Sequence, residues 1–361
     1  MFLRNIWYYA LPASELKPGQ MLHKVLLGEP VVFARSKEGE VFALRDLCPH
    51  RGVPLSSGRL CGKGSTVDGN TLSEPQIECP YHGWRFGPDG ACKAIPSLVD
   101  GQQMDVGRIR VRRYPVREQQ GNIWIWMPPV SDGPVLEDTP EPDHEPPVMP
   151  AVESRQPALI ERMIFDCHVD HAVIGLMDPA HGPYVHRSVF WRSEKSMYAK
   201  EKAFGPSEMG FTMLPHAPSK NSRFYKILGG GLTTEISFRL PGVRVEHITA
   251  GSRGSVVGLT SVTPLTETST EVTQSFYWTL PVLGALKPLL RPFVRSFLKQ
   301  DGDMVNIQKE GLKFDPRLML INDSDVQAKW YFRLKDAWKE AGETRAAFTN
   351  PVKPATLRWR S

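Results

Sequence analysis

The segments CPHRG (residues 48–52) and CPYHGW (residues 79–84) decide how the first third of this chain is built. Each contributes one cysteine and one histidine to a candidate metal site, and those residues are Cys48, His50, Cys79 and His82. Thiolates are soft ligands, and neutral imidazoles bind zinc and iron. The prolines stiffen both segments, and the glycines permit tight turns. The two loops therefore predict either a tetrahedral zinc site or an iron–sulfur cluster.

Ligand order along the chain separates these alternatives. A zinc finger usually pairs Cys with Cys and His with His. Here each loop supplies one of each, which favours a [2Fe-2S] cluster with the cysteines on one iron and the histidines on the other. The surroundings predict strands rather than a zinc finger, because VVFARS (31–36), VFALRD (41–46) and NIWIWMP (122–128) are β-favouring runs.

Both loops closely resemble the cluster-binding loops of Rieske [2Fe-2S] domains in residue type, order and flanking residues. The resemblance implies that the two cysteines and two histidines ligate a Rieske cluster. One departure is the gap of 28 residues between His50 and Cys79, which is longer than the family usually shows. Its surplus, CGKGSTVDGNTLSEP (61–75), is interpreted as a surface insertion, and Cys61 and Cys92 are interpreted as ordinary thiols.

The segment LMDPAHGPYVHRS (176–188) holds a second candidate metal site, with Asp178, His181 and His186. The preceding residues predict a helix that ends near Pro183, which would place Asp178 and His181 on one helix face. The Gly-Pro pair is then expected to break the helix, so that His186 turns back toward His181. Two imidazoles and a carboxylate with open positions form the facial triad of non-haem Fe(II) oxygenases.

The pattern D-x2-H-x4-H resembles the catalytic segment of Rieske non-haem iron oxygenases. By that resemblance, His181 and His186 ligate a mononuclear Fe(II). Asp178 would link a cluster histidine of the neighbouring subunit to an iron-ligating histidine, as a bridge for electron transfer. Gly175 departs from the family, because relatives often carry Asn at this position.

The third iron ligand is expected further along the chain. In the family it is an Asp that follows a long helix, and KQDGDMVNIQ (299–308) fits that pattern. The resemblance assigns Asp301 as the ligand and Gln308 as the matching later residue. Asp303 is the rival candidate, two positions on.

The chain divides into a β-rich part (residues 1–127), a Pro-rich linker (128–150) and a mixed part (151–361). Residues 281–312 are interpreted as helices interrupted by prolines. The opening FLRNIWYYALPASEL (2–16) looks like the start of vanillate O-demethylase oxygenase components. The resemblance implies an α+β fold, with an N-terminal all-β Rieske [2Fe-2S] domain followed by an SRPBCC (helix-grip) catalytic domain. It also implies a homotrimer that receives electrons from a separate ferredoxin or NAD(P)H reductase.

Composition and motifs exclude several classes of protein. The formal net charge is +5 with no basic-aromatic strip, so no nucleic-acid partner is expected. The odd count of five cysteines is a poor disulfide framework. The sequence has no signal-peptide pattern and no apolar run of about 18 residues, so we expect a cytoplasmic protein without a transmembrane segment. No GxGxxG fingerprint occurs in a suitable βαβ context, which agrees with a separate reductase.

The expected function is that of a terminal oxygenase, which uses O2 to monooxygenate, most simply to demethylate or hydroxylate, an aromatic or related ring compound. Cis-dihydroxylation is the alternative within the family, and a Rieske electron-transfer protein without catalysis is the alternative outside it. Candidate pocket residues, each more often core than pocket, are Phe190, Trp191, Phe204, Phe211, Leu232, Ile236 and Phe238. Lys220, Arg223 and Lys226 are candidates to meet an acidic substrate group or are simply solvated.

Overall fold

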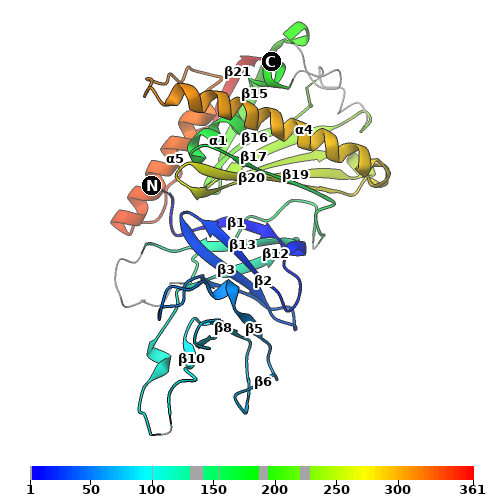
Figure 1. The fold of residues 1–361 in the computed structure, drawn as a ribbon. Coiled ribbons are helices and arrows are strands. Elements are labelled where there is room, and N and C mark those ends of the chain that lie inside the picture. Colours follow the sequence, from blue (N-terminus) through cyan, green and yellow to red (C-terminus); the bar gives the residue numbers. More distant parts are fainter. Residues whose placement is uncertain (1, 100, 131–140, 154, 187–193, 220–227) are drawn as a thin grey trace. The chain divides into compact units, whose positions relative to one another are not determined.

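A computed structural model describes residues 2–99, 101–130, 141–153, 155–186, 194–219 and 228–361 (Figure 1). These residues form two compact units. One spans Arg4–Pro147, and the other spans Val148–Ser361 together with Phe2 and Leu3. Residues 131–140 of the expected linker lie outside the described ranges.

The unit Arg4–Pro147 is built from small antiparallel sheets. Their strand orders are β1-β13-β12, β11-β4-β3-β2, β10-β9-β8-β5 and β6-β7. The strands are β1 (Ile6–Pro12), β2 (Met21–Leu26), β3 (Glu29–Arg35), β4 (Val41–Arg45), β5 (Arg59–Cys61), β6 (Thr66–Val67), β7 (Asn70–Thr71), β8 (Gln76–Glu78), β9 (Arg85–Phe86), β10 (Cys92–Ala94), β11 (Arg113–Tyr114), β12 (Val116–Gln119) and β13 (Asn122–Met127). Short 3₁₀ helices are η1 (Ala13–Glu15), η2 (Leu55–Ser57) and η3 (Val106–Arg108). This unit is all-β, as predicted.

The core of this unit holds both cluster loops in place. Cys48 and Cys79 belong to one cluster of buried side chains, which includes Leu44, Ile77 and Phe86. Leu44 ends the apolar run of β4 just before the first loop, and the two other residues come from β8 and β9 on either side of the second loop. Burying these strand residues therefore fixes the backbone at both ends of the candidate metal site.

The other unit contains one eight-stranded antiparallel sheet, in the order β14-β20-β19-β18-β17-β16-β15-β21. Its strands are β14 (Leu159–Phe165), β15 (Ala199–Ser207), β16 (Gly210–His216), β17 (Thr233–Arg239), β18 (Val243–Thr249), β19 (Ser255–Thr266), β20 (Ser269–Trp278) and β21 (Ala355–Arg360). Its helices are α1 (Val169–Met177), α2 (Gly182–Val185), η4 (Glu194–Ser196), η5 (Gly251–Arg253), α4 (Pro281–Leu312) and α5 (Val326–Thr344). The whole chain is α+β, which confirms the predicted fold class.

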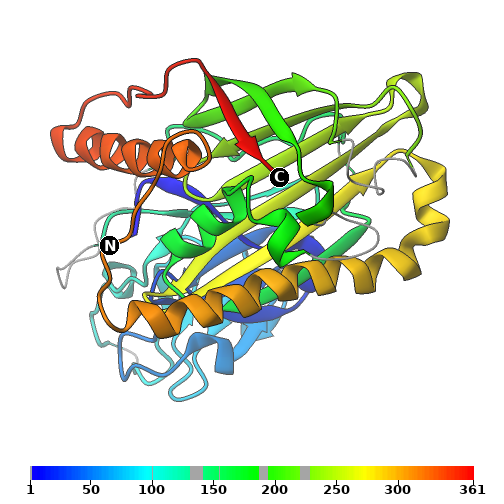
Figure 2. The same ribbon diagram turned by 90° about the horizontal axis from the view of Figure 1, so that it is seen from above.

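Helices cover one face of this sheet. Figure 2 shows α1 and α4 lying across that face. Side chains alternate along a strand, so Ile236 and Phe238 of β17 point to the same side. Phe238 meets the ring of Tyr331 from α5 edge-on, with the ring centroids 5.8 Å apart. Phe238 thus packs α5 against the sheet, whereas Ile236, on the same face, lines a cavity.

Helix α4 is one continuous helix of 32 residues, with Pro288 and Pro292 inside it. The interpretation of this stretch as several helices was therefore wrong. Each internal proline removes only one N–H donor, and the remaining hydrogen bonds carry the helix past it. Gly302 lets the helix approach β14 closely, because a Cβ atom there would lie 3.1 Å from Cε1 of Phe165.

Candidate metal centres

The two cluster loops have the same backbone structure. In the first, the N–H of Cys48 donates to the carbonyl oxygen of Val53 at 2.8 Å, and the N–H of Gly52 donates to that of Cys48 at 2.8 Å. The second loop repeats both bonds between Cys79 and the residues five and four positions later, at 2.8 and 3.1 Å. Gly52 and Gly83 have φ angles of +69° and +70°, which glycine adopts without steric cost.

The cysteine and histidine side chains of these loops differ in burial. Cys48 and Cys79 are each only 2% exposed, whereas His50 is partly exposed and His82 is exposed. The two imidazole centroids lie 4.5 Å apart, and the ring of Trp84 stacks on His50 at 4.6 Å. A metal group bound here would have its thiolates facing the core and its imidazoles at the surface.

The chemistry of this donor set fits a [2Fe-2S] cluster. Burial raises the pKa of the Cys48 thiol to about 11, and the adjacent Cys79 thiol acts in the same direction. Two thiolates at this depth therefore require cations to balance them. The Nδ1 atom of His50 is buried and makes no hydrogen bond within the described residues. Two cysteines paired with two histidines is the ligand set of a Rieske centre.

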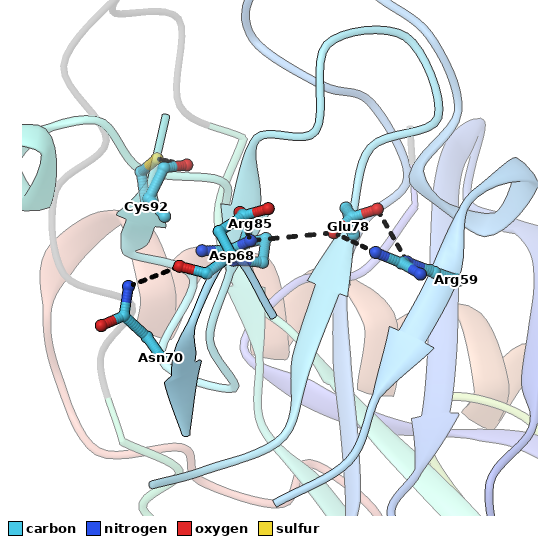
Figure 3. Close-up of polar contacts among 7 residues, drawn as sticks. Arg59, Asp68, Asn70, Glu78, Arg85 and Cys92 are labelled. Atoms are coloured by element: carbon cyan, nitrogen blue, oxygen red, sulfur yellow. Dashed lines mark hydrogen bonds and ion pairs between the residues drawn. The ribbon is translucent and has the colours of Figure 1, made fainter. Parts of the chain in front are cut away.

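The long gap between the loops folds back on the second loop. Figure 3 shows Glu78, which directly precedes the loop, accepting from Arg59 at 2.7 Å. Arg85, which directly follows the loop, is buried and pairs with Asp68 of the gap segment, with Glu78 3.9 Å away. Arg59 of β5 therefore holds the residue before the loop, and Asp68 of the insertion holds the residue after it, although the insertion was expected only as a surface segment.

The two remaining cysteines of this unit lie in apolar or backbone contacts. Cys61 is buried in a small cluster with Val67 and Leu72. The thiol of Cys92 contacts the carbonyl oxygen of Ala94 at 3.5 Å. Burial raises the pKa of both thiols.

At the second candidate site, the helix ends earlier than predicted. Helix α1 ends at Met177, and Asp178 has extended backbone angles (φ −61°, ψ 119°). The reason is Pro179, because a residue before proline is disfavoured in the helical conformation. A turn, not a shared helix face, brings Asp178 and His181 together, with the Asp178 Oδ2 atom 3.7 Å from the His181 Nδ1 atom.

The Gly-Pro pair begins a helix, where the sequence interpretation had one end. Helix α2 starts at Gly182 with Pro183 in its first turn. Proline is well placed there, because the N–H groups of a first turn lack helical acceptors in any case. The short helix ends at Val185, and the Nε2 atom of His186, the next residue, lies 3.1 Å from the Nε2 atom of His181. The expected meeting of the two histidines is present, although by a different route.

Asp301 of α4 completes a group of three metal-ligating side chains. Its Oδ1 atom lies 3.1 Å from His186 Nε2 and 3.6 Å from His181 Nε2. Two ligands bound side by side to a metal at about 2.1 Å lie about 3 Å apart, so the three atoms fit one face of an octahedron. The rival Asp303 is 55% exposed and pairs with Lys299 at 2.8 Å through its Oδ1 atom, away from the histidines.

The electrostatics of this group also suit a cation. Burial acts to lower the pKa of His181, but the carboxylates of Asp178 and Asp301 outweigh it and raise that pKa. The Oδ2 atom of Asp301 and the Nδ1 atom of His181 are buried and make no hydrogen bond within the described residues. The donor set therefore fits an Fe(II) with open positions.

Two further residues of α4 contact His186, and neither was among the site residues predicted from the sequence. The Nδ1 atom of His186 lies 3.0 Å from Oε1 of Gln300, so the ring donates to the amide oxygen and directs Nε2 toward the metal position. The ring of Phe297 stacks on His186 at 3.5 Å. Phe297 and Gln300 lie four positions and one position before Asp301 on the same helix, so they could have been suggested as neighbours of the metal site if α4 had been predicted to be continuous.

A cavity of about 280 Å³ opens beside these ligands, between the sheet and helices α1, α4 and α5. Its apolar wall includes Met177, Ile236, Phe276, Trp278, Leu290 and Phe293. Of the pocket candidates from the sequence, Ile236 lines this cavity. Phe204, Phe211, Leu232 and Phe238 are buried in the core, whereas Phe190, Trp191, Lys220, Arg223 and Lys226 lie outside the described residues.

Comparison with known families covers both units. Residues 6–115 match the Rieske [2Fe-2S] domain, and residues 165–338 match the vanillate O-demethylase oxygenase C-terminal domain. The chain belongs to the Rieske oxygenases. In this Rieske oxygenase, the first match contains both cluster loops, and the second contains all three side chains of the octahedral face.

Individual relatives are similar over about half of this Rieske oxygenase. The oxygenase component of dicamba O-demethylase from Stenotrophomonas maltophilia is 35% identical over 189 residues, which cover 52% of this chain and 48% of that protein. Chlorophyllide a oxygenase from Arabidopsis thaliana is 31% identical over 193 residues, which cover 52% of this chain and 30% of that protein. The matched region thus spans less than half the length of these curated relatives.

Solved structures are similar over nearly the whole chain. Dicamba monooxygenase bound to dicamba superposes with a TM-score of 0.73 at 22% identity, covering 95% of this chain and 99% of that chain. The QL mutant of Pseudomonas putida CBB5 NdmA with caffeine gives 0.70 at 18% identity, covering 98% and 96%. At such identities the likeness establishes the fold. None of the helices in the described ranges is long and apolar enough to span a membrane.

Proposed function

We propose that this Rieske oxygenase is a terminal oxygenase that monooxygenates an aromatic or related ring compound, most simply by demethylation or hydroxylation. The observation that carries the proposal is the group of His181, His186 and Asp301, whose ligand atoms face one another at the wall of a cavity. We propose these three as ligands of the mononuclear Fe(II), and the two cysteines and two histidines of the cluster loops as ligands of the [2Fe-2S] group.

The chain's own residues prepare the reaction site. When bound, the iron and the cluster supply O2 activation and electrons. Gln300 and Phe297 hold the His186 ring in one orientation, which keeps its Nε2 atom directed at the metal position. The apolar wall of the cavity holds a ring compound beside that position and excludes water from it.

We propose that electrons enter from a separate ferredoxin or reductase and that the protein works as a homotrimer. The exposed His82 is available to a second copy of the chain, and the Asp178 side chain is 34% exposed beside His181. Asp178 is then the bridge between the cluster of one copy and the iron of the next. All five cysteines are free and buried, which agrees with a cytoplasmic enzyme.

The activities of relatives support the proposed kind of reaction. They include an O-demethylase, an N-alkylformylase and monooxygenases, as well as a chlorobenzoate dioxygenase. The match of residues 165–338 to the vanillate O-demethylase oxygenase C-terminal domain favours the addition of one oxygen atom over cis-dihydroxylation.

Metal analysis and one substitution test the site. The purified protein is expected to contain about three Fe per chain, two in the cluster and one at the triad. His181→Ala should retain the visible absorbance of the cluster, lose the third iron and lose turnover. Two Fe per chain in the wild type, or normal turnover by the variant, would show that the catalytic assignment is wrong.

A single-turnover screen tests the reaction. Reduced protein is mixed with O2 and a panel of methoxylated, N-methylated and unsubstituted aromatic compounds, and the products are identified by mass spectrometry. Formaldehyde release supports demethylation, and a gain of one oxygen supports hydroxylation. A product with two added oxygens and two added hydrogens would replace the proposal with cis-dihydroxylation.

A further inference from the structure

Three neighbouring strands place polar side chains at one part of the cavity wall. Lys202 lies on β15, His216 on β16 and Thr234 on β17, and all three line the cavity. His216 is the direct register partner of Thr234. Neighbouring strands lie about 4.8 Å apart, so the three side chains form a short polar row on an otherwise apolar wall.

The charges of the cavity wall are mostly satisfied within the protein. Lys200 donates to the Oγ atom of Ser361 at 2.8 Å, and Arg244 donates to Glu246 at 3.2 Å. Asp178 and Asp301 belong to the candidate iron site.

Lys202 differs from these charged residues. Its ammonium group donates to the carbonyl oxygen of Ala217 at 3.2 Å and is paired with no carboxylate of the described residues. Burial lowers the pKa of Lys202, and no acidic group counteracts that effect. A partly buried ammonium that lacks a counter-ion is costly unless a ligand supplies one.

The neighbouring imidazole of His216 does not supply a positive charge to the cavity. The Nδ1 atom of His216 lies 2.8 Å from the carbonyl oxygen of Leu214, so Nδ1 carries the hydrogen and the neutral ring presents Nε2 as an acceptor. Burial and the charge of Lys202 lower the pKa of His216, against the opposing effects of the Leu214 carbonyl and Glu246. The neutral ring therefore adds no positive charge, and the charge complement for an anion rests on Lys202.

Thr234 adds an uncommitted hydroxyl to the row. The residue is 1% exposed, and its Oγ1 atom makes no hydrogen bond within the described residues. A buried hydroxyl without a partner is uncommon, and a ligand in the cavity is the partner that this position can take. The hydroxyl can donate or accept, so it suits an oxyanion or a second polar substituent.

We infer that the substrate carries an acidic group, a carboxylate or a sulfonate, which binds the ammonium of Lys202 in this cavity. This inference rests on the proposed function, because it takes the cavity as the substrate site. The inference predicts that the protein prefers acidic ring compounds to neutral ones. Its relatives include enzymes named for both classes, toluene-4-sulfonate and a methylsterol.

Binding of matched acids and amides tests the inference. Methoxybenzoates and methoxybenzenesulfonates are compared with their neutral amides by calorimetry, on iron-loaded protein without O2. The wild type is expected to bind at least one acid more tightly than its amide. Lys202→Met should weaken binding of that acid about 30-fold, the effect of losing one charge-assisted hydrogen bond, and leave the amide unchanged. Lys202→Arg keeps the charge and should retain most of the affinity.

A surface variant controls for net charge. Lys313→Met removes one positive charge from an exposed residue outside the cavity, and should leave acid binding unchanged. If the wild type prefers no acid over its amide, or if Lys202→Met binds acids normally, the substrate class is wrong. Turnover of neutral ethers to formaldehyde, unaffected by Lys202→Met, would also overturn it while leaving the proposed oxygenase intact. Absence of the third iron would instead overturn the proposed function.

Discussion

Gly302 is the position at which a single methyl group tests how α4 positions Asp301, the proposed iron ligand. The residue follows Asp301 and packs against β14. A Cβ atom at this position would lie 3.1 Å from Cε1 of Phe165 and 3.3 Å from the sulfur of Met163. Such contacts are closer than normal van der Waals contact, and the Phe165 ring is fully buried. We therefore expect Gly302→Ala to push α4 outward by a few tenths of an ångström.

The size of the effect follows from two opposing contributions. Replacing Gly by Ala inside a helix stabilises it by about 1 kcal/mol. Forcing a methyl group into a filled space costs about 1–3 kcal/mol. The net expectation for Gly302→Ala is a loss of about 1 kcal/mol. Gly284 on the same helix has no atom within 4 Å of its would-be Cβ atom, so Gly284→Ala should instead gain about 1 kcal/mol.

Scanning calorimetry and Fe(II) titration measure both consequences. The difference of about 2 kcal/mol should separate the melting temperatures of the two variants by about 5 °C in a unit of this size. Moving α4 also moves the Asp301 carboxylate away from His186, so Gly302→Ala should bind Fe(II) about tenfold more weakly. If Gly302→Ala melted as high as Gly284→Ala and bound Fe(II) like the wild type, the close contact would not be what positions Asp301.

Two further predictions concern residues that support the helices of this unit. Gln300→Leu removes the hydrogen-bond acceptor for His186 and should weaken Fe(II) binding about 10- to 100-fold, whereas Gln300→Glu should retain most of the affinity. Wild-type affinity of Gln300→Leu in the same Fe(II) titration would show that Gln300 does not orient His186. Burial acts to raise the pKa of Asp170, but hydrogen bonds from Lys335 and Tyr331 outweigh it and hold that pKa below its ordinary value of 3.8. That stabilisation is fully present above the ordinary value and is lost as pH falls through the lower folded value, so wild type should lose melting temperature more steeply than Asp170→Asn below about pH 4. Parallel profiles of the two proteins would contradict it.

The cluster loops could be predicted because their determinants are local. Ligand type, order and turn glycines all fall within segments of five and six residues, and the backbone hydrogen bonds of each loop span at most five positions along the chain. The all-β unit followed from short runs of β-favouring residues. The ion pair between Asp68 and Arg85 could not be predicted, because it depends on where the insertion at residues 61–75 folds back on the second loop.

At the proposed iron site, the sequence predicted which side chains meet but not the backbone that brings them together. The two histidines and Asp301 were found by pattern, but the helix boundary was placed too late, because the effect of Pro179 on Asp178 was overlooked. Gln300 contributes only through the position of α4 against α2, which no local pattern encodes. The row of polar residues in the cavity is further from prediction, since it is assembled by pairing of three separate strands.

The two prolines inside α4 make its stiffness uneven. A helix resists bending through its hydrogen bonds between residues four apart, and Pro288 and Pro292 each delete one such bond in the half that supplies most of the helix's cavity-lining residues. The half that carries Asp301 has no proline and packs on β14 through Gly302. We therefore expect ligands of different bulk to be accommodated by flexing of the first half, while the second half keeps the carboxylate in place for iron. The helix would then let the cavity wall adapt to a ligand without displacing the carboxylate proposed to hold the iron.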